Sequence, residues 1–341
     1  GTSTNMNANE VIANRAIELM GGKLGSKTPV HPNDHVNKSQ SSNDVIPTAI
    51  NLSAAILIND NLLVSLKRLK KHLNKKSKEF KKVIKIGRTH FQDATPITLG
   101  QEFSGYEFLI KKSINSINYS FKNLLLLAQG GTAVGTGINA HKNFAKILIN
   151  EIKKTSKIPF KETQNHFEAQ SAQFAPLSIS SDLKELAVSL SKISNDIRLM
   201  GSGPRAGFNE LILPSTQPGS SIMPGKVNPV ICESMLQVCG QVIGNDLAIT
   251  YGAQGGILEL NLMLPLISHN LLESITILDN SINNFIDRLL KGLKANIEQC
   301  KKYADMSLAL CTALVPILGY DKSAEVSKKA FKLNKSIKEV L

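Results

Sequence analysis

The chain has 341 residues, of which 42% are hydrophobic and 20% are charged. This composition provides enough apolar material for a buried core and excludes disorder as a description of the whole chain. Forty lysines and arginines against 27 acidic residues give a formal net charge of +13, but only six of the forty are arginine. Arginine makes most bidentate contacts to bases, and the chain has no tryptophan for base stacking, so its charge does not indicate a nucleic-acid partner.

The sequence shows no pattern typical of a membrane protein or a secreted disulfide scaffold. Its longest purely apolar run, Leu124–Ala128, is far shorter than the roughly 18 residues that cross a bilayer, and the polar N-terminal residues do not resemble a signal peptide. Cys232, Cys239, Cys300 and Cys311 lie in apolar, helix-like stretches without C-x-x-C spacing. We therefore expect buried, reduced thiols and a cytoplasmic protein, with the mitochondrial matrix as the alternative in a eukaryote.

The predicted secondary structure is almost entirely helical. Apolar residues recur at helical spacing from residue 42 to about residue 78, and one short strand is predicted next, at 83–87. Four more long helices are predicted at about 98–129, 165–200, 228–251 and 261–293. After residue 293 the helical segments shorten and are interrupted by Pro316 and Gly319.

The predicted helices are unusually long. Helices of about 25–35 residues are two to three times the usual mean length. They indicate an elongated bundle instead of a compact α/β domain, and the several apolar faces of five such helices are hard to bury within one subunit. We therefore expect an all-α protein that self-associates, with a small C-terminal module after residue 293.

Four polar segments rich in turn-forming residues interrupt the helical pattern. They read HPNDHVNKSQSSND at 31–44, GRTHFQDA at 87–94, GGTAVGTG at 130–137 and GSSIMPGKVNP at 219–229. In the first, Ser41, Ser42 or Asn43 can cap the following helix, and Asp44 can face its positive end. One cap suffices for a helix, and four polar residues in a row also offer donors to a bound carboxylate.

The other three segments differ in how strongly their residues indicate a functional role. His90, in the second, is equally compatible with a structural loop histidine and with proton transfer. The glycine-rich third segment follows a helix instead of a strand, which excludes a dinucleotide loop and favours a tight turn beside a site. The fourth is a loop with two serines and Lys226, suited to closing over a small anion. No spacing typical of metal ligands occurs, so we expect no metal.

Taken together, these segments resemble a known family. Residues 219–229 are similar to the signature loop of the fumarase/aspartase superfamily of lyases. The other segments, with GRTHFQDATPITLGQEFSGY at 87–106 and SGPRAG at 202–207, resemble class II fumarate hydratases, and the resemblance covers essentially the whole chain in order. Aspartate ammonia-lyases usually carry Gln, Thr and Ala where this chain has His90, Ser42 and Gly225, so all three positions follow the fumarase pattern.

The resemblance implies an all-α fold, the long-helix bundle of the fumarase/aspartase superfamily with a small C-terminal helical module. It divides the chain into the end of an N-terminal domain (1–40), a central helical-bundle domain (41–293) and part of a C-terminal domain (294–341). We therefore expect the chain to be a portion of a longer subunit. The resemblance also implies a homotetramer in which each active site draws residues from three subunits.

By the same resemblance the reaction is the reversible, stereospecific hydration of fumarate to (S)-malate, a step of the tricarboxylic acid cycle, without a cofactor. Ser220 matches the base that removes a proton, His90 matches the acid that acts through a water, and Glu233 matches the acidic partner of that histidine. The implied intermediate is an aci-carboxylate, whose added charge the site must stabilise. The implied substrate-binding residues are Thr2, Ser41, Ser42, Asn43, Thr89, Ser221, Lys226 and Asn228. A second dicarboxylate site is implied at His31, Asn33 and Asp34.

Two alternatives remain beside this interpretation. An aspartate ammonia-lyase is the nearest competitor, because it shares most of the motifs. A catalytically silent structural homologue would keep the bundle and lose the chemistry, although every matched catalytic position holds the expected residue type. The expected partners are a small dicarboxylate substrate and further copies of the chain, with neither nucleic acid nor membrane.

Overall fold

The computed structural model describes residues 1–341 and is built mainly of helices. The chain forms two compact units, each assembled from three separate stretches of sequence. Unit 1 comprises Gly1–Val64, Ser113–Ala187 and Val238–Asp279, and unit 2 comprises Ser65–Lys112, Val188–Gln237 and Asn280–Leu341. Long helices run through the boundaries between these stretches, which explains why each unit recruits distant parts of the sequence.

The helices and strands fall in the following order. The α-helices are α1 (Thr2–Leu19), α2 (Ser42–Leu57), α3 (Leu63–Glu79), α4 (Leu99–Leu124), α5 (Phe144–Ser156), α6 (His166–Ser171), α7 (Phe174–Met200), α8 (Val230–Ala253), α9 (Leu264–Phe285), α10 (Ile297–Met306), α11 (Val315–Leu318), α12 (Tyr320–Leu333) and α13 (Ile337–Val340). Three π-helical turns are η1 (Pro32–Val36), η2 (Ile58–Leu62) and η3 (Ile286–Leu290), and η4 (Leu308–Leu314) is a 3₁₀-helix. The strands are β1 (Ile84–Thr89), β2 (Gln92–Thr98), β3 (Leu126–Leu127), β4 (Lys161–Glu162), β5 (Leu211–Ile212), β6 (Gly256–Ile257), β7 (Leu260–Asn261) and β8 (Lys294–Ala295).

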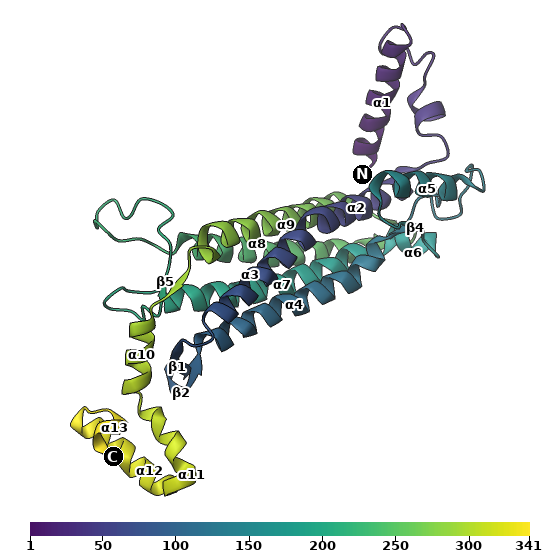
Figure 1. Ribbon diagram of the computed structural model, residues 1–341. Coiled ribbons are helices and arrows are strands. Elements are labelled where there is room, and N and C mark those ends of the chain that lie inside the picture. The colour runs from purple at the N-terminus through teal and green to yellow at the C-terminus, as the bar shows by residue number, and fades with distance from the viewer. The chain divides into compact units, whose positions relative to one another are not determined.

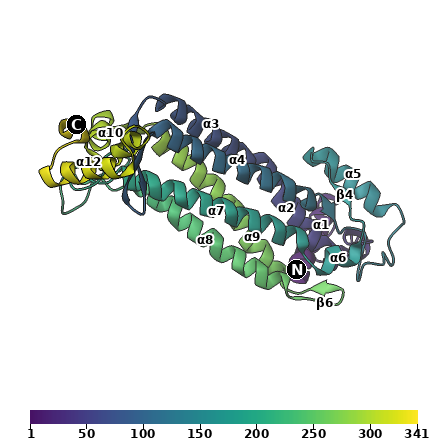
Figure 2. The same cartoon turned by 90° about the horizontal axis from the view of Figure 1, so that it is seen from below.

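All five long helical segments predicted from apolar periodicity are present. The first is the uninterrupted run α2–η2–α3, and the others are α4, α6 with α7, α8, and α9 with η3. In each unit, stretches of these helices lie side by side (Figures 1 and 2). Their buried residues are mostly apolar, chiefly Ile, Leu and Ala except in α8, which buries Cys232, Met235, Cys239 and Val242. The all-α class predicted from the sequence is therefore confirmed.

Two features of the secondary structure were wrong in the sequence-based prediction. One strand was expected and eight short ones are present, of which β2 is the longest. Strand β2 contains Pro96 and buries no residue completely, so it has neither the composition nor the alternation of a typical strand. It is tolerated because it pairs only with β1, in a two-stranded antiparallel sheet where Pro96 faces Ile86.

Helix α1 was also not predicted. Its buried residues recur every four positions, as in an amphipathic helix, but the first two of the four are Asn5 and Asn9. Only Ala13 and Ile17 supply apolar surface, so the stripe is too polar to be recognised from hydrophobicity. The helix packs against η1 within unit 1.

Unit 2 has an aromatic cluster at its core. The rings of Phe80 and Phe103 lie 5.3 Å apart at 78°, and those of Phe103 and Tyr106 lie 5.3 Å apart at 68°. Both pairs adopt the edge-to-face geometry that the ring quadrupole favours. The cluster joins the end of α3 to the first half of α4, on either side of the β1–β2 hairpin in the sequence.

The continuous helix Ser42–Glu79 has an 18-residue window with a mean hydropathy of 1.5, so by length and composition it could cross a membrane. Half of that window is buried within the protein. A helix of this kind is also what the core of a helical bundle requires.

Candidate active site

The N-terminus of α2 is closed by a capping box. The Ser41 hydroxyl accepts a hydrogen bond from the backbone N–H of Asn43 at 3.2 Å, and the Ser41 N–H donates to Asp44 Oδ1 at 2.9 Å. This arrangement satisfies two of the donors that a helix leaves unpaired at its first turn. The sequence-based expectation of a cap at residues 41–43 is therefore confirmed, with Ser41 as the capping residue.

Asp44 also holds the glycine-rich loop. Its second oxygen, Oδ2, accepts hydrogen bonds from the N–H groups of Gly130 at 3.0 Å and Thr132 at 2.9 Å. Burial raises the pKa of this fully buried carboxyl, and the backbone donors of Ser41, Thr132 and Gly130 oppose that rise. The neighbouring Asn43 donates from Nδ2 to the Ala133 carbonyl at 2.7 Å. Adjacent side chains of α2 thus fix the loop beside the helix N-terminus.

The loop needs glycine at its first positions. A Cβ at Gly131 would lie 2.1 Å from Gln170 Oε1, and one at Gly130 would lie 2.6 Å from the Cβ of Ala145. Gly130 also has φ +105°, a conformation that other residues rarely adopt. The loop is therefore a tightly packed turn next to the α2 N-terminus, as the sequence suggested.

Two further groups of expected site residues lie in unit 1. Ser42 accepts a hydrogen bond on Oγ from the side-chain amide of Asn5 at 3.0 Å, and Thr2 is exposed at the start of α1. In the segment expected to form a second dicarboxylate site, His31 caps the π-helical turn η1. Its Nδ1 accepts from the N–H groups of Asn33 and Asp34, each at 3.2 Å, and the side chains of these two residues are exposed.

In unit 2, His90 lies at the tip of the β1–β2 hairpin. Thr89 pairs with Gln92, so His90 and Phe91 form a two-residue turn. Both have positive φ, 55° and 60°, which matches the mirror-image turns that suit a hairpin's twist but normally require glycine or asparagine. Non-glycine residues held in this region typically store on the order of 1–3 kcal/mol of strain each, and such strain concentrates at functional sites. Thr89 and His90 are both exposed.

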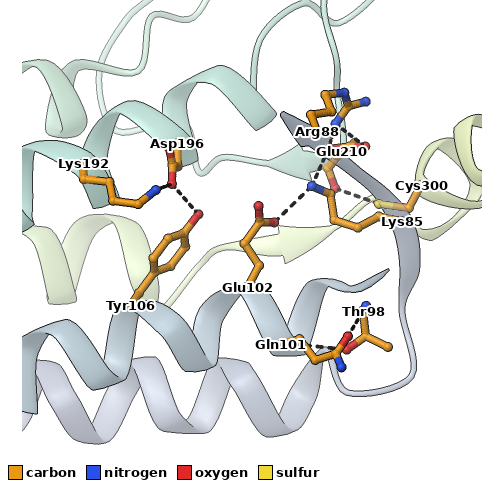
Figure 3. Close-up of polar contacts among 10 residues, drawn as sticks. All are labelled: Lys85, Arg88, Thr98, Gln101, Glu102, Tyr106, Lys192, Asp196, Glu210 and Cys300. Atoms are coloured by element: carbon orange, nitrogen blue, oxygen red, sulfur yellow. Dashed lines mark hydrogen bonds and ion pairs between the residues drawn. The ribbon is translucent and has the colours of Figure 1, made fainter. Parts of the chain in front are cut away.

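Arg88, the residue before this turn, is fixed by a buried carboxylate. Its Nη1 donates to both oxygens of Glu210, at 3.0 and 2.9 Å (Figure 3). Its guanidinium lies 4.3 Å from the ring centroid of Phe208. Glu210 has no exposed surface and also lies 3.3 Å from the ammonium of Lys85. Lys85 in turn donates to Glu102 at 3.0 Å. These four charged side chains, the Arg88–Glu210 network, link the hairpin to the segment that leads into the 219–229 loop.

A second group of polar side chains, also in unit 2, lies next to the Arg88–Glu210 network and includes Tyr106 of α4. The Tyr106 hydroxyl donates to Asp196 Oδ2 at 3.0 Å, and Lys192 binds the same oxygen (Figure 3). Burial, followed by the charges of Glu102 and Asp196, raises the pKa of Tyr106 far above its ordinary value. Tyr106 therefore remains a neutral donor at all physiological pH values.

The 219–229 loop is folded around the Ser220 hydroxyl. Ser220 Oγ accepts hydrogen bonds from the backbone N–H groups of Ile222 at 3.3 Å and Met223 at 3.2 Å. The loop is closed at its base by the Ser220 N–H, which donates to the Lys226 carbonyl at 2.9 Å. Ser221, Lys226 and Asn228 are exposed. Two main-chain donors aimed at one serine oxygen would stabilise negative charge on it.

A large cavity lies under this loop, within unit 2. Its volume is about 960 Å³, and its wall includes Lys226, Asn228, Arg198, Asn195 and Phe91. A small dicarboxylate is much smaller than this space, so the cavity can hold a substrate together with water or with groups from another chain. Its cationic and amide side chains suit an anionic ligand.

The expected site residues fall into two groups that belong to different units. Thr2, Ser41, Ser42 and Asn43 lie in unit 1, and Thr89, His90, Ser220, Ser221, Lys226, Asn228 and Glu233 lie in unit 2. Glu233 is half-buried in the first turn of α8, and the chain makes no hydrogen bond or ion pair between it and His90. No group of three or more His, Cys, Asp or Glu side chains is placed to bind a metal ion.

Sequence reasoning missed several residues that support the site. Arg88 and Glu210 were not singled out, although Arg88 belongs to the GRTHFQDA segment and a cation beside a candidate acid is a usable signal. Asp44 was expected only to face the helix dipole, and its contacts with residues 130 and 132 lie too far along the chain to be foreseen. Asn5 was not predicted to support the site, because polar residues at helical spacing usually face solvent.

Comparison with known proteins agrees with this fold. A family profile described as "Lyase" matches residues 1–244, and one described as "Fumarase C C-terminus" matches residues 310–341. A solved structure of recombinant class II fumarase from Schistosoma mansoni superposes with a TM-score of 0.96 at 43% identity, covering 100% of this chain and 74% of the other. The long-helix bundle is thus the architecture of this class of lyases.

Curated relatives with similar sequences show which family of lyases the chain resembles. The mitochondrial fumarate hydratase of Homo sapiens is 51% identical over 99% of this chain, and the chain spans 66% of that relative, just under two thirds of its length. A class II fumarate hydratase of Wigglesworthia glossinidia brevipalpis is 52% identical over 99% of the chain and 73% of its own length. The chain therefore belongs to the class II fumarate hydratase family of lyases.

Proposed function

We propose that the protein catalyses the reversible hydration of fumarate to (S)-malate. The observation that carries this proposal is the loop geometry at Ser220, whose hydroxyl accepts two backbone hydrogen bonds beside a cavity containing Lys226 and Asn228. The relatives that share this chain's sequence are named as fumarate hydratases, which indicates the substrate. The names also include mitochondrial and bacterial proteins, so we assign the cytoplasm or the mitochondrial matrix as its compartment.

In the dehydration direction, Ser220 takes the proton from the carbon next to one carboxylate of malate. A serine hydroxyl is a weak base, and the N–H groups of Ile222 and Met223 reduce the cost of the alkoxide form that would accept the proton. The electron pair of the broken C–H bond moves into the adjacent carboxylate, which becomes an aci-carboxylate. Lys226 and Asn228, which line the cavity, are the donors that stabilise that charge as it develops during the reaction.

The hydroxyl group of malate then leaves as water while the carbon–carbon double bond forms. His90 supplies the proton through a bound water, and Glu233 is the acidic partner that orients its ring. Thr89, Ser221 and the α2 donors Ser41, Ser42 and Asn43, together with Thr2, bind the carboxylates. The helix N-terminus contributes a favourable partial charge for a dianion.

We further propose a homotetramer whose active sites combine residues of three subunits. The support within the chain is the surface of α8, where Ile243, Leu247 and Tyr251 are exposed on one face. Gly240 and Gly244 lie on the same face with no atom within 4 Å of a Cβ placed on either residue. Glycines at i and i+4 beside exposed apolar residues allow another helix to approach closely. In such an assembly the partner of His90 would be the Glu233 of another subunit.

We assign residues 1–40, 41–293 and 294–341 to the end of an N-terminal domain, the central bundle domain and part of a C-terminal domain. His31, Asn33 and Asp34 form a second dicarboxylate site, in which His31 caps the turn that presents the other two. Neither a cofactor nor a metal takes part.

The test is a direct assay of the purified protein with (S)-malate and, separately, with L-aspartate, following the ultraviolet absorbance of the fumarate double bond. We expect fumarate from malate only, and Ser220→Ala should lower kcat by about 10²–10⁴ because it removes the positioned base. Ser215→Ala, at an exposed serine in the segment just before the loop, is the matched control and should be silent.

Other results of this assay would support different conclusions. Fumarate from aspartate would favour the ammonia-lyase, and no turnover of either substrate would favour a silent homologue. Near-normal turnover by Ser220→Ala would remove Ser220 from its role as the base.

A further inference from the structure

Three asparagines, of which Asn5 and Asn9 are buried, connect α1 to the segment that precedes α2. Asn37 donates from Nδ2 to the Gln40 carbonyl at 3.2 Å, and its Oδ1 accepts from Asn5 Nδ2 at 3.2 Å and from Asn9 Nδ2 at 3.0 Å. Asn9 Nδ2 also donates to Asn5 Oδ1 at 3.3 Å, and Asn5 Nδ2 donates to Ser42 Oγ at 3.0 Å. Asn5 and Asn9 are each only 6% exposed. We call this group the amide ladder.

The direction of every hydrogen bond in the amide ladder follows from one backbone carbonyl. The Gln40 carbonyl can only accept, so the nitrogen of Asn37 must face it and the oxygen of Asn37 must face the other way. That oxygen can only accept, so Asn5 and Asn9 must present their nitrogens to it. The side-chain amide orientations are thereby fixed by the chemistry of the partners.

The hydrogen bond between Asn5 Nδ2 and Ser42 Oγ determines the role of the Ser42 hydroxyl. Asn5 Nδ2 has two hydrogens, one bound to Asn37 and one to Ser42, so it is fully used and cannot accept. The Ser42 oxygen is therefore the acceptor in this contact, and its hydroxyl proton must point elsewhere. Ser42 is the first residue of α2, beside the capping residue Ser41, so this proton is available at the helix N-terminus.

We propose that Asn5 is a positioning residue that fixes the Ser42 hydroxyl as a hydrogen-bond donor to a substrate carboxylate. The inference rests on the proposed function, in which Ser42 binds substrate. Without Asn5 the hydroxyl could rotate and would lose its preorganisation for an anion. Because Asn5 acts through ground-state binding, its loss raises KM and leaves kcat nearly unchanged.

The amide ladder supplies its own control. Asn9 has the same burial as Asn5 and binds the same oxygen of Asn37, but it makes no contact with Ser42. Asn5→Ala and Asn9→Ala therefore remove the same type of side chain, one helical turn apart, from the same packed surface. Only Asn5→Ala removes the contact with Ser42.

The experiment compares kcat, KM for (S)-malate and the unfolding temperature of the assembled enzyme for Asn5→Ala, Asn9→Ala, Ser42→Ala and the two double variants. We expect Asn5→Ala to raise KM about 3- to 10-fold, the effect of one lost hydrogen bond, with kcat within about twofold. Asn9→Ala should lower the unfolding temperature similarly but leave KM near normal. Asn5→Ala/Ser42→Ala should match Ser42→Ala alone, whereas Asn9→Ala should act independently of Ser42.

Other results overturn the inference in distinguishable ways. Equal increases in KM for Asn5→Ala and Asn9→Ala would show that the amide ladder only supports the fold. If Ser42→Ala raises KM and Asn5→Ala does not, Asn5 has no positioning role although Ser42 binds substrate. If Ser42→Ala leaves KM unchanged, the substrate role of Ser42 fails and the inference fails with it.

If Asn5→Ala does not fold, a second pair of variants, Asn5→Asp and Asn9→Asp, tests the inference. Asn5→Asp keeps the shape of the side chain but cannot donate, so it draws the Ser42 proton away from the substrate. Asn9→Asp places the same charge one turn away and corrects for electrostatic repulsion of the dianion. A larger KM for Asn5→Asp than for Asn9→Asp supports the inference, and equal values overturn it.

Discussion

Glu210 shows how a single buried charge can organise a site. Its side chain has no exposed surface and lies against the cations of Arg88 and Lys85, whose own side chains are 15% and 3% exposed. A buried carboxylate is tolerated only when such partners replace the water it has lost. Because Arg88 directly precedes Thr89 and His90, the orientation of the candidate acid depends on a residue about 120 positions further along the chain.

We expect Glu210→Gln to destabilise the protein strongly. The substitution keeps the size of the side chain but leaves two buried cations with one carboxylate, a loss that typically costs about 3–5 kcal/mol. Thermal unfolding at a fixed protein concentration measures the effect.

Asp287→Asn is the matched control for this prediction. Asp287 pairs with Arg68 and Lys291, which lower its pKa to about 2, but its side chain is 43% exposed. Exposed pairs contribute little, so this variant should unfold near the wild-type temperature. Equal shifts for the two variants would contradict the buried-network explanation.

Residue-level predictions from the sequence succeeded where the interaction is local. Ser41 could be identified as a cap because a capping bond spans two or three positions. The four cysteines were expected to be buried thiols and are, and burial raises the pKa of Cys232 to about 12 and of Cys300 to about 11. The partners of Asp44 and Arg88 could not be predicted, because no local pattern connects residues that far apart in the sequence.

At the scale of whole elements, hydrophobic periodicity predicted the long helices and missed those with polar stripes. The segment 42–79 buries a continuous apolar face and was recognised, whereas α1 buries Asn5 and Asn9 in two of its four core positions. The hairpin strand β2 was missed for a related reason, because its stability comes from pairing with β1 and not from an alternating pattern. Elements that depend on tertiary contacts are the ones that periodicity cannot predict.

The exposed face of α8 provides an element-scale prediction. Leu247 is 71% exposed in the single chain and lies one turn from Gly244. If this face binds another copy of the chain, Leu247→Asp places a charge in an apolar interface and should convert the proposed tetramer into smaller species with little activity. Light scattering coupled to gel filtration measures the mass of the particle.

Ile147→Asp is the comparison for this variant. Ile147 is 59% exposed on α5, an apolar residue of similar size outside the α8 face. It should leave the mass of the particle unchanged. A tetramer that persists in Leu247→Asp would show that α8 does not form the interface.

At the scale of the molecule, the expected catalytic residues are divided between the two units. The N-terminus of α2, which we propose binds the substrate carboxylates, belongs to unit 1, while His90 and the Ser220 loop belong to unit 2. The resemblance of the motifs predicted which residues matter but not how one chain distributes them, because each unit combines three distant stretches of sequence. This division fits the proposed sharing of active sites between chains.

Mixing two inactive variants tests the sharing of sites. Ser220→Ala and His90→Asn each lack one proton-transfer group, so each alone should lose about 10²–10⁴ in kcat. If Ser220 and His90 of one site come from different subunits, random assortment gives about one quarter of the sites both native residues. Activity should therefore return after subunit exchange.

The interpretation of the mixture depends on proof that subunits exchanged. Mass spectrometry of the intact assembly, with one variant carrying a mass tag, detects mixed tetramers. Mixed tetramers without recovered activity would show that both residues of a site come from one chain.

The Arg88–Glu210 network has a consequence for how substrate reaches the protein. Its two cations and two carboxylates sum to zero, so none of the net charge of +13 resides in this buried group. The surplus is carried by side chains in contact with the solvent, where mobile ions screen it over about 8–10 Å at physiological salt. Capture of the proposed dianionic substrate should therefore be sensitive to ionic strength, whereas the ionic interactions that hold the hairpin in place are largely shielded from it.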